Sequence, residues 1–182
     1  MTTYIALLRG INVGGKNIVK MDKLAQCFIG IGFLDVKTYI QSGNIIFKSQ
    51  DNDKLKLMEM IENQLLKEFS VEIKTALITA DEIKETIENA PENFGVEPEK
   101  FRYDVWFLMP HVTVSKITSE IRLRDGIDSM WAGKNVLYTS RLTSEMDKSY
   151  FSKIMQTSVY KYITIRNWNT VTKILELINL NP

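Results

Sequence analysis

Residues 3–17 read TYIALLRGINVGGKN, and the fold can be worked outward from this segment. Residues 3–9 predict a short, almost wholly apolar strand, the kind that is covered on both faces of a sheet. The glycine-rich part that follows places Gly10, Gly15 and Lys16 at the G-x-x-x-x-G-K spacing of a phosphate-binding loop. Asn17 stands where that motif has Ser or Thr, so the hydroxyl that would coordinate a metal ion is missing.

Helical and strand patterns follow this loop in a regular order. Helices are predicted over residues 21–31 and 52–69, and strands over 36–40, 45–48 and 72–79. Together with the first strand they give the order β-α-β-β-α-β, which is the ferredoxin-like arrangement.

The second half repeats this order beyond an acidic helix near 80–90 and a junction that contains Pro and Gly. The predicted strands and helices cover residues 102–109, 114–123, 127–131, 136–140, 147–155, 162–166 and 168–180. We therefore expect an α+β fold of two tandem ferredoxin-like subdomains with a C-terminal helix. The expected boundaries are 1–90 for the N-terminal subdomain and 91–182 for the C-terminal subdomain.

Composition and charge narrow the class of protein. A chain of 182 residues that is 45% hydrophobic has the composition of a globular protein, and its net charge of +1 gives no general attraction to nucleic acid or membrane. A single cysteine, Cys27, excludes an internal disulfide and suits a reducing compartment. No signal-peptide pattern opens the sequence, and no apolar run approaches the roughly 20 residues that span a bilayer. We expect a cytoplasmic protein with no membrane partner.

The charges are unevenly distributed. Residues 1–20 carry three basic side chains and no acidic one, whereas residues 81–99 carry seven acidic side chains against Lys84 alone. An anion-binding surface is therefore expected near the glycine-rich loop. The β-branched Ile18 and Val19 delay the next helix, and no strand ends in a metal-binding aspartate, which argues against nucleotide hydrolysis. The loop either binds an anion or is a glycine-rich connection with a solvated lysine.

Two further polar clusters lie at the ends of predicted strands. Residues 41–44 (QSGN) can present an amide, a hydroxyl and backbone N–H groups to a ligand, or can form a plain hairpin turn. Residues 166–169 (RNWN) join a strand to the last helix, so one asparagine is expected to cap that helix. The arginine and tryptophan can hold an anion or stack on a base. His111 is expected on the surface and Cys27 in the core, and no metal site is indicated.

Three blocks, residues 4–17, 39–47 and 166–171, resemble in this order the hallmark blocks of a bacterial family of uncharacterised proteins, domain-of-unknown-function family 1697. The resemblance extends over essentially the whole chain. It implies two ferredoxin-like subdomains and brings no activity, cofactor or catalytic residue. Family members tend to carry a glycine-rich segment with Ser-Lys-Leu before the penultimate strand. Here Ser152 and Lys153 are present but the preceding glycines are not, which leaves any ligand contact of that backbone open.

Three classes of function stay open, and the sequence indicates neither a cofactor nor an oligomeric state. The leading hypothesis is a protein that binds an anionic, phosphate-bearing small molecule or a nucleic-acid end. The alternatives are an enzyme on a nucleotide or phosphorylated substrate, with Asp104, Asp128 or Asp147 at a raised pKa, and a protein–protein interaction module. The predicted ligand-binding residues are Arg9, Asn12, Gly14, Gly15, Lys16, Gln41, Ser42, Asn44, Arg166, Asn167 and Trp168.

Overall fold

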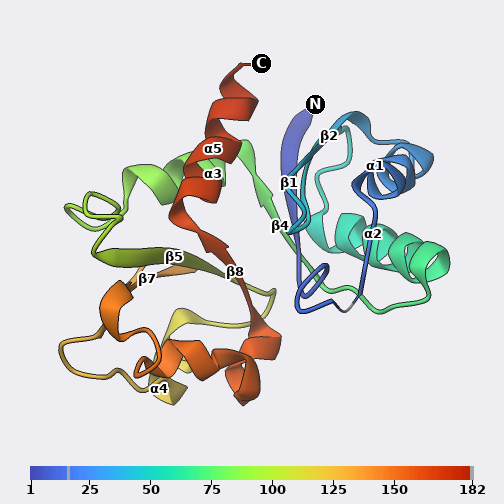
Figure 1. Cartoon of the computed structure of the whole chain (residues 1–182). Helices are drawn as coiled ribbons and strands as arrows, with labels where there is room; N and C mark the ends of the chain where they lie inside the picture. The colour runs from blue at the N-terminus through green and yellow to red at the C-terminus, as the bar shows by residue number, and fades with distance from the viewer. Residues whose placement is uncertain (16, 181–182) are drawn as a thin grey trace. The chain divides into compact units, whose positions relative to one another are not determined.

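The computed structural model describes residues 1–15 and 17–180, and the chain divides into two compact units (Figure 1). Unit 1 comprises Met1–Ile83 together with the end of the chain from Ile178, and unit 2 comprises Lys84–Leu177. Each unit contains one four-stranded antiparallel sheet. The predicted mixed α+β class with a C-terminal helix is therefore confirmed.

Unit 1 is built around the strand that opens the sequence. Its elements are β1 (Thr2–Leu8), α1 (Met21–Gly30), β2 (Leu34–Tyr39), β3 (Asn44–Ser49), α2 (Lys54–Phe69) and β4 (Thr75–Thr79), followed by the start of α3 (Ala80–Glu88). The strand order is β2-β3-β1-β4, so β1 is an interior strand. The pair Leu7↔Asn44 brings the end of β1 beside the turn between β2 and β3. This register brings two of the three polar blocks to one end of the sheet.

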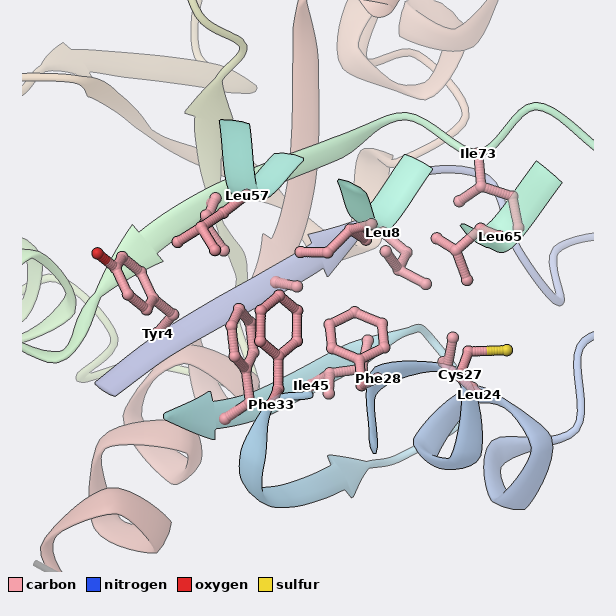
Figure 2. Packing of buried hydrophobic residues seen from close by; sticks show 14 of the residues in the cluster. Tyr4, Leu8, Leu24, Cys27, Phe28, Phe33, Ile45, Leu57, Leu65 and Ile73 are labelled. Carbon is pink, nitrogen blue, oxygen red and sulfur yellow. The ribbon is translucent and has the colours of Figure 1, made fainter. Parts of the chain in front are cut away.

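An apolar core joins one face of this sheet to α1 and α2 (Figure 2). From Tyr4 onward, every second residue of β1 belongs to it, as expected for a strand whose side chains alternate between faces. Cys27 lies in this core, and burial raises the pKa of its thiol, as suits an inert core residue. The rings of Phe33 and Phe47 stack with centroids 4.3 Å apart. Helix stripes and strand residues contribute Tyr4, Ala6, Leu8, Leu24, Phe28, Ile45, Leu57, Ile61 and Leu65.

Unit 2 carries the second sheet. Its elements are β5 (Phe101–Leu108), α4 (Val114–Glu120), β6 (Asp128–Ala132), β7 (Val136–Leu142), β8 (Ile163–Asn167) and α5 (Trp168–Asn179), with 3₁₀ turns at Thr143–Glu145, Tyr150–Gln156 and Ser158–Tyr162. The strand order is β6-β7-β5-β8, with β5 in the interior. One core cluster gathers Trp106, Ile117, Leu137, Phe151, Ile154, Val159 and Ile163.

The predicted helix over residues 147–155 is wrong, because this segment forms 3₁₀ turns instead. Short polar side chains compete here for the backbone groups that an α-helix would use. Ser149 Oγ accepts the N–H of Phe151, and Ser152 Oγ donates to the carbonyl of Met146. Thr157 Oγ1 donates to the carbonyl of Ile154 in the same way.

A second group of side chains in unit 2 is aromatic, with Phe94 at its centre. The Phe94 ring lies edge-to-face against Tyr103, Trp131, Tyr138 and Trp168, with centroids 4.9–6.0 Å apart. The buried Tyr138 hydroxyl donates a hydrogen bond of 2.6 Å to the carbonyl of Thr86. Burial raises the pKa of Tyr138 to about 12, and the nearby Glu85 carboxylate adds to the shift.

The raised pKa of Tyr138 predicts a loss of stability at high pH. A pKa above the ordinary value of 10.0 means that the stabilisation is complete below pH 10 and is lost as the pH rises through about 12. We expect the free energy of unfolding to fall less steeply between pH 10 and 12 in Tyr138→Phe than in the wild type, as measured by urea denaturation. The same slope in both proteins would contradict the assignment.

Candidate functional site

The β1–α1 loop, residues 9–20, lies at the end of β1 in unit 1. Ile11 and Val19 are buried in the unit 1 core and anchor the loop at two points. Between these anchors, Gly14 and Gly15 are exposed to solvent. The backbone takes left-handed conformations, which glycine and asparagine tolerate best, at Gly10, Asn12, Gly14, Gly15 and Asn17.

The side chain of Asn12 holds the loop together. Its Oδ1 accepts the N–H of Val19 at 2.8 Å, and its Nδ2 donates to the carbonyl of Val19 at 3.0 Å. The same Nδ2 donates to the carbonyl of Gln41 at 2.8 Å, which ties the loop to the neighbouring turn. The loop also closes through Asn17, whose carbonyl accepts the Asn12 N–H and whose Nδ2 donates to the carbonyl of Gly10.

The β2–β3 turn, residues 40–43, packs against this loop. The carbonyl of Gly43 accepts the N–H of Leu8 at 2.8 Å, and a side chain at position 43 would collide with Ile11 and Leu8. Asn44 is fully buried, and its Nδ2 donates to the carbonyl of Tyr39 and to Ser42 Oγ. Only glycine fits at position 43, and Asn44 fixes the turn from inside.

The structure thus sorts the predicted site residues of unit 1 into two groups. The carboxamides of Asn12 and Asn44 are engaged in holding the loop and the turn. The residues at the same end that remain candidates for a ligand are Arg9, Gly14, Gly15, Gln41 and Ser42. Lys16 lies outside the described residues.

Positive charge gathers at this end of unit 1. Arg9 N–H donates to the carbonyl of Lys74, and a hydrogen bond from Lys74 Nζ to Glu62, 2.8 Å long, raises the pKa of Lys74. The charge of Arg9 acts in the opposite direction on that pKa, so the two cations lie close together. α1 begins at Met21 without a side-chain cap from Lys20, and the acidic Asp22 lies in its first turn, where it offsets part of the positive end of the helix dipole.

The third polar block lies in unit 2, where each side chain has partners within the fold. Arg166 is buried, its guanidinium donates to Thr164 Oγ1 and to the carbonyl of Ile165, and burial lowers its pKa to about 10. Asn167 Oδ1 accepts the N–H of Asn169 in the first turn of α5, as the predicted cap does, and its Nδ2 donates to the carbonyl of Tyr103. Trp168 packs on Phe94 and on Gly95, where a Cβ would lie 2.3 Å from the indole nitrogen.

A charged cluster around the buried Asp104 in unit 2 does not follow from the sequence. The carboxylate of Asp104 accepts bonds from Arg102 Nε at 3.0 Å and Arg141 Nη2 at 3.1 Å. The i, i+2 spacing of Arg102 and Asp104 places both on the same face of β5 and indicates their pairing. Arg141 joins them through the β5–β7 register, which the sequence does not show. Asp128 is the second buried aspartate among the predicted catalytic candidates. Its carboxylate accepts hydrogen bonds from Ser149 Oγ and from the N–H groups of residues 124 and 150.

The remaining features considered from the sequence are His111, a metal site, a membrane-spanning helix and an acid with a raised pKa. His111 is exposed in a left-handed turn conformation. Among residues 1–15 and 17–180, no group of His, Cys, Asp and Glu side chains is arranged to hold a metal ion. No helix within those ranges has the length and apolar character to cross a membrane. The hydrogen bond from Lys56 lowers the pKa of Asp51, opposite to the direction that an acid catalyst would need.

Comparisons with known proteins extend over most of the chain. A family model described as a protein of unknown function (DUF1697) matches residues 1–138. The solved structure of a conserved bacterial protein from Streptococcus pneumoniae is similar, with 30% sequence identity and a TM-score of 0.83, over 96% of this chain and 97% of that one. Among proteins of curated function, none matches. The comparisons therefore support the fold and carry no activity.

The contact of Gly43 with the loop predicts a specific loss of stability. A Cβ at position 43 would lie 2.6 Å from Ile11 Cδ1 and 2.9 Å from Leu8 Cβ, at a φ of +75°. Gly43→Ala should therefore lower the free energy of unfolding by about 2–4 kcal/mol. Gly10→Ala is the matched control, because its φ is +70° but nothing lies within 4 Å of the added Cβ. It should lose about 1–2 kcal/mol. Equal losses in urea denaturation would show that the packing of loop on turn is not as described.

Proposed function

The chain belongs to the DUF1697 family of proteins of unknown function, and from this premise we propose that unit 1 binds an anionic, phosphate-bearing small molecule at the end of β1. The binding groups are Arg9, the exposed backbone at Gly14 and Gly15, and the turn residues Gln41 and Ser42. Lys16, which lies outside the described residues, is proposed as a further cation at this site.

The observation that carries the proposal is the way the glycine bend is built. Asn12 and Asn17 fix the loop by bonds within it, and the glycines at its tip stay exposed, with no atom within 4 Å of where their side chains would be. A phosphate-binding loop needs this combination of a fixed backbone and open access to its N–H groups. Such a loop binds without the ordering cost that a flexible loop would bear.

Charge supports the same proposal. Arg9 and Lys74 are adjacent at this end, because the Arg9 N–H donates to the carbonyl of Lys74, and the charge of Arg9 acts on the pKa of Lys74. A guanidinium beside backbone N–H groups is a strong combination for phosphate oxygens. Binding without hydrolysis is favoured, because the side chain at the motif's metal-coordinating position, Asn17, donates to the carbonyl of Gly10.

We also propose a fold description for each unit, a cellular location and a domain boundary. A ferredoxin-like description of each unit is supported by the antiparallel strand orders β2-β3-β1-β4 and β6-β7-β5-β8 with the first strand inside. A cytoplasmic location is supported by the single cysteine in the sequence. The domain boundary near residue 90 is kept as a prediction, next to the division into compact units between Ile83 and Lys84.

Thermal unfolding in the presence of inorganic phosphate and pyrophosphate tests the proposal. An anion at about 100 times its dissociation constant stabilises the fold by about 2.7 kcal/mol, which is roughly 5–11 °C for a chain of this size. Arg9→Gln should weaken binding about tenfold, because it removes a charged donor. Lys67→Gln, which removes the same charge from an exposed position on α2, should leave the affinity unchanged. No shift in the wild type, or equal losses in both variants, would contradict a site at this loop.

A further inference from the structure

Three aliphatic side chains stand exposed around the proposed anion site. Val13, Ile18 and Ile40 are 48%, 76% and 47% exposed. Each is the immediate sequence neighbour of a residue joined by the Asn12 side chain: Val13 follows Asn12, Ile18 precedes Val19, and Ile40 precedes Gln41. The hydrogen bonds that build the loop therefore also bring the backbone at these three residues to the same end of unit 1, and we call residues 13, 18 and 40 the apolar rim.

The conformation of Ile40 separates this rim from ordinary surface composition. Ile40 has a φ of +49°, a left-handed conformation that is unfavourable for a β-branched residue. Asn or Gly would take this turn position more easily. Because Ile40 is about half exposed, burial in the core does not offset the strain either. Residues held in strained backbone conformations of this kind tend to occur at binding and active sites.

We propose that the ligand is a nucleoside phosphate, with its phosphate on the glycine bend and its base on the apolar rim. This inference rests on the proposed function and names the class of ligand. Ligand sites combine an apolar lining with a few polar groups that fix orientation. Here the exposed Gln41 carries an amide donor and an amide acceptor next to Ile40, which suits the polar edge of a base. A lipid acyl chain would have no use for that amide beside the apolar contact.

The charge distribution agrees with a nucleoside phosphate. Arg9, Lys16 and Lys20 are the charged residues of the first twenty, and none of those twenty is acidic. A monophosphate meets this local positive charge without the extended basic surface that tight binding of a nucleic-acid chain requires. The local charge of this segment therefore suits a single nucleotide.

Calorimetric titration with three probes tests the inference: inorganic phosphate, ribose 5-phosphate and adenosine 5′-monophosphate. The wild type should bind the nucleotide about tenfold more tightly than the sugar phosphate, because only the nucleotide covers the apolar rim. Ile40→Asn should abolish this difference, leave the affinity for inorganic phosphate unchanged, and raise the unfolding temperature by about 2–4 °C through relief of strain. Leu66→Asn, at an exposed leucine of α2, is the control and should leave all three affinities unchanged.

The outcomes separate this inference from the proposed function. Equal affinities for the nucleotide and the sugar phosphate in the wild type, with phosphate binding intact, overturn the nucleoside inference alone. Binding to vesicles of anionic phosphatidylglycerol that Ile40→Asn weakens and the nucleotide does not compete overturns it in favour of a lipid surface. Absence of binding for all three phosphates overturns the proposed function and this inference with it.

Discussion

The carboxamide of Asn12 is the interaction on which the end of unit 1 depends. One side chain joins the two arms of the β1–α1 loop through Val19 and joins the loop to the β2–β3 turn through Gln41. Loss of this carboxamide would leave three backbone groups without these hydrogen bonds, namely the N–H and the carbonyl of Val19 and the carbonyl of Gln41. Because Ile11 and Val19 are buried, they anchor the loop in the core on either side of the exposed Gly14 and Gly15.

This construction uses several of the polar residues to hold the fold together. Carboxamides that the sequence predicts as ligand contacts donate to backbone carbonyls instead, as Asn12 and Asn44 do in unit 1 and Asn167 does in unit 2. At the same end of unit 1, Gln41 and the strained Ile40 are exposed, and Arg9 and Ser42 are partly exposed. A polar cluster in a sequence is therefore a poor guide to ligand contacts until the turn chemistry has been accounted for.

The sequence predicts the elements well because their patterns are local. Apolar periodicity places α2 and β1, and Gly43 and the Gln-Ser-Gly-Asn turn predict the hairpin. The helix prediction around Ser149 is wrong because the helical spacing of apolar residues does not show that nearby hydroxyl groups hydrogen-bond to the backbone. The site is predicted only in part: the meeting of loop and turn depends on the Leu7↔Asn44 register, and the Asp104–Arg141 pair on the β5–β7 register. Register between strands is a tertiary property that neither segment encodes alone.

Amide hydrogen exchange of Val19, measured by NMR in the protein without ligand, tests the central claim most directly. The Val19 N–H donates to Asn12 Oδ1 at 2.8 Å, in the segment between β1 and α1. The account predicts that this amide is protected in the wild type before any anion is added, and that Asn12→Ala removes the protection while amides of β1 keep theirs. Exchange of Val19 at the rate of an open loop in the wild type would contradict a prebuilt site.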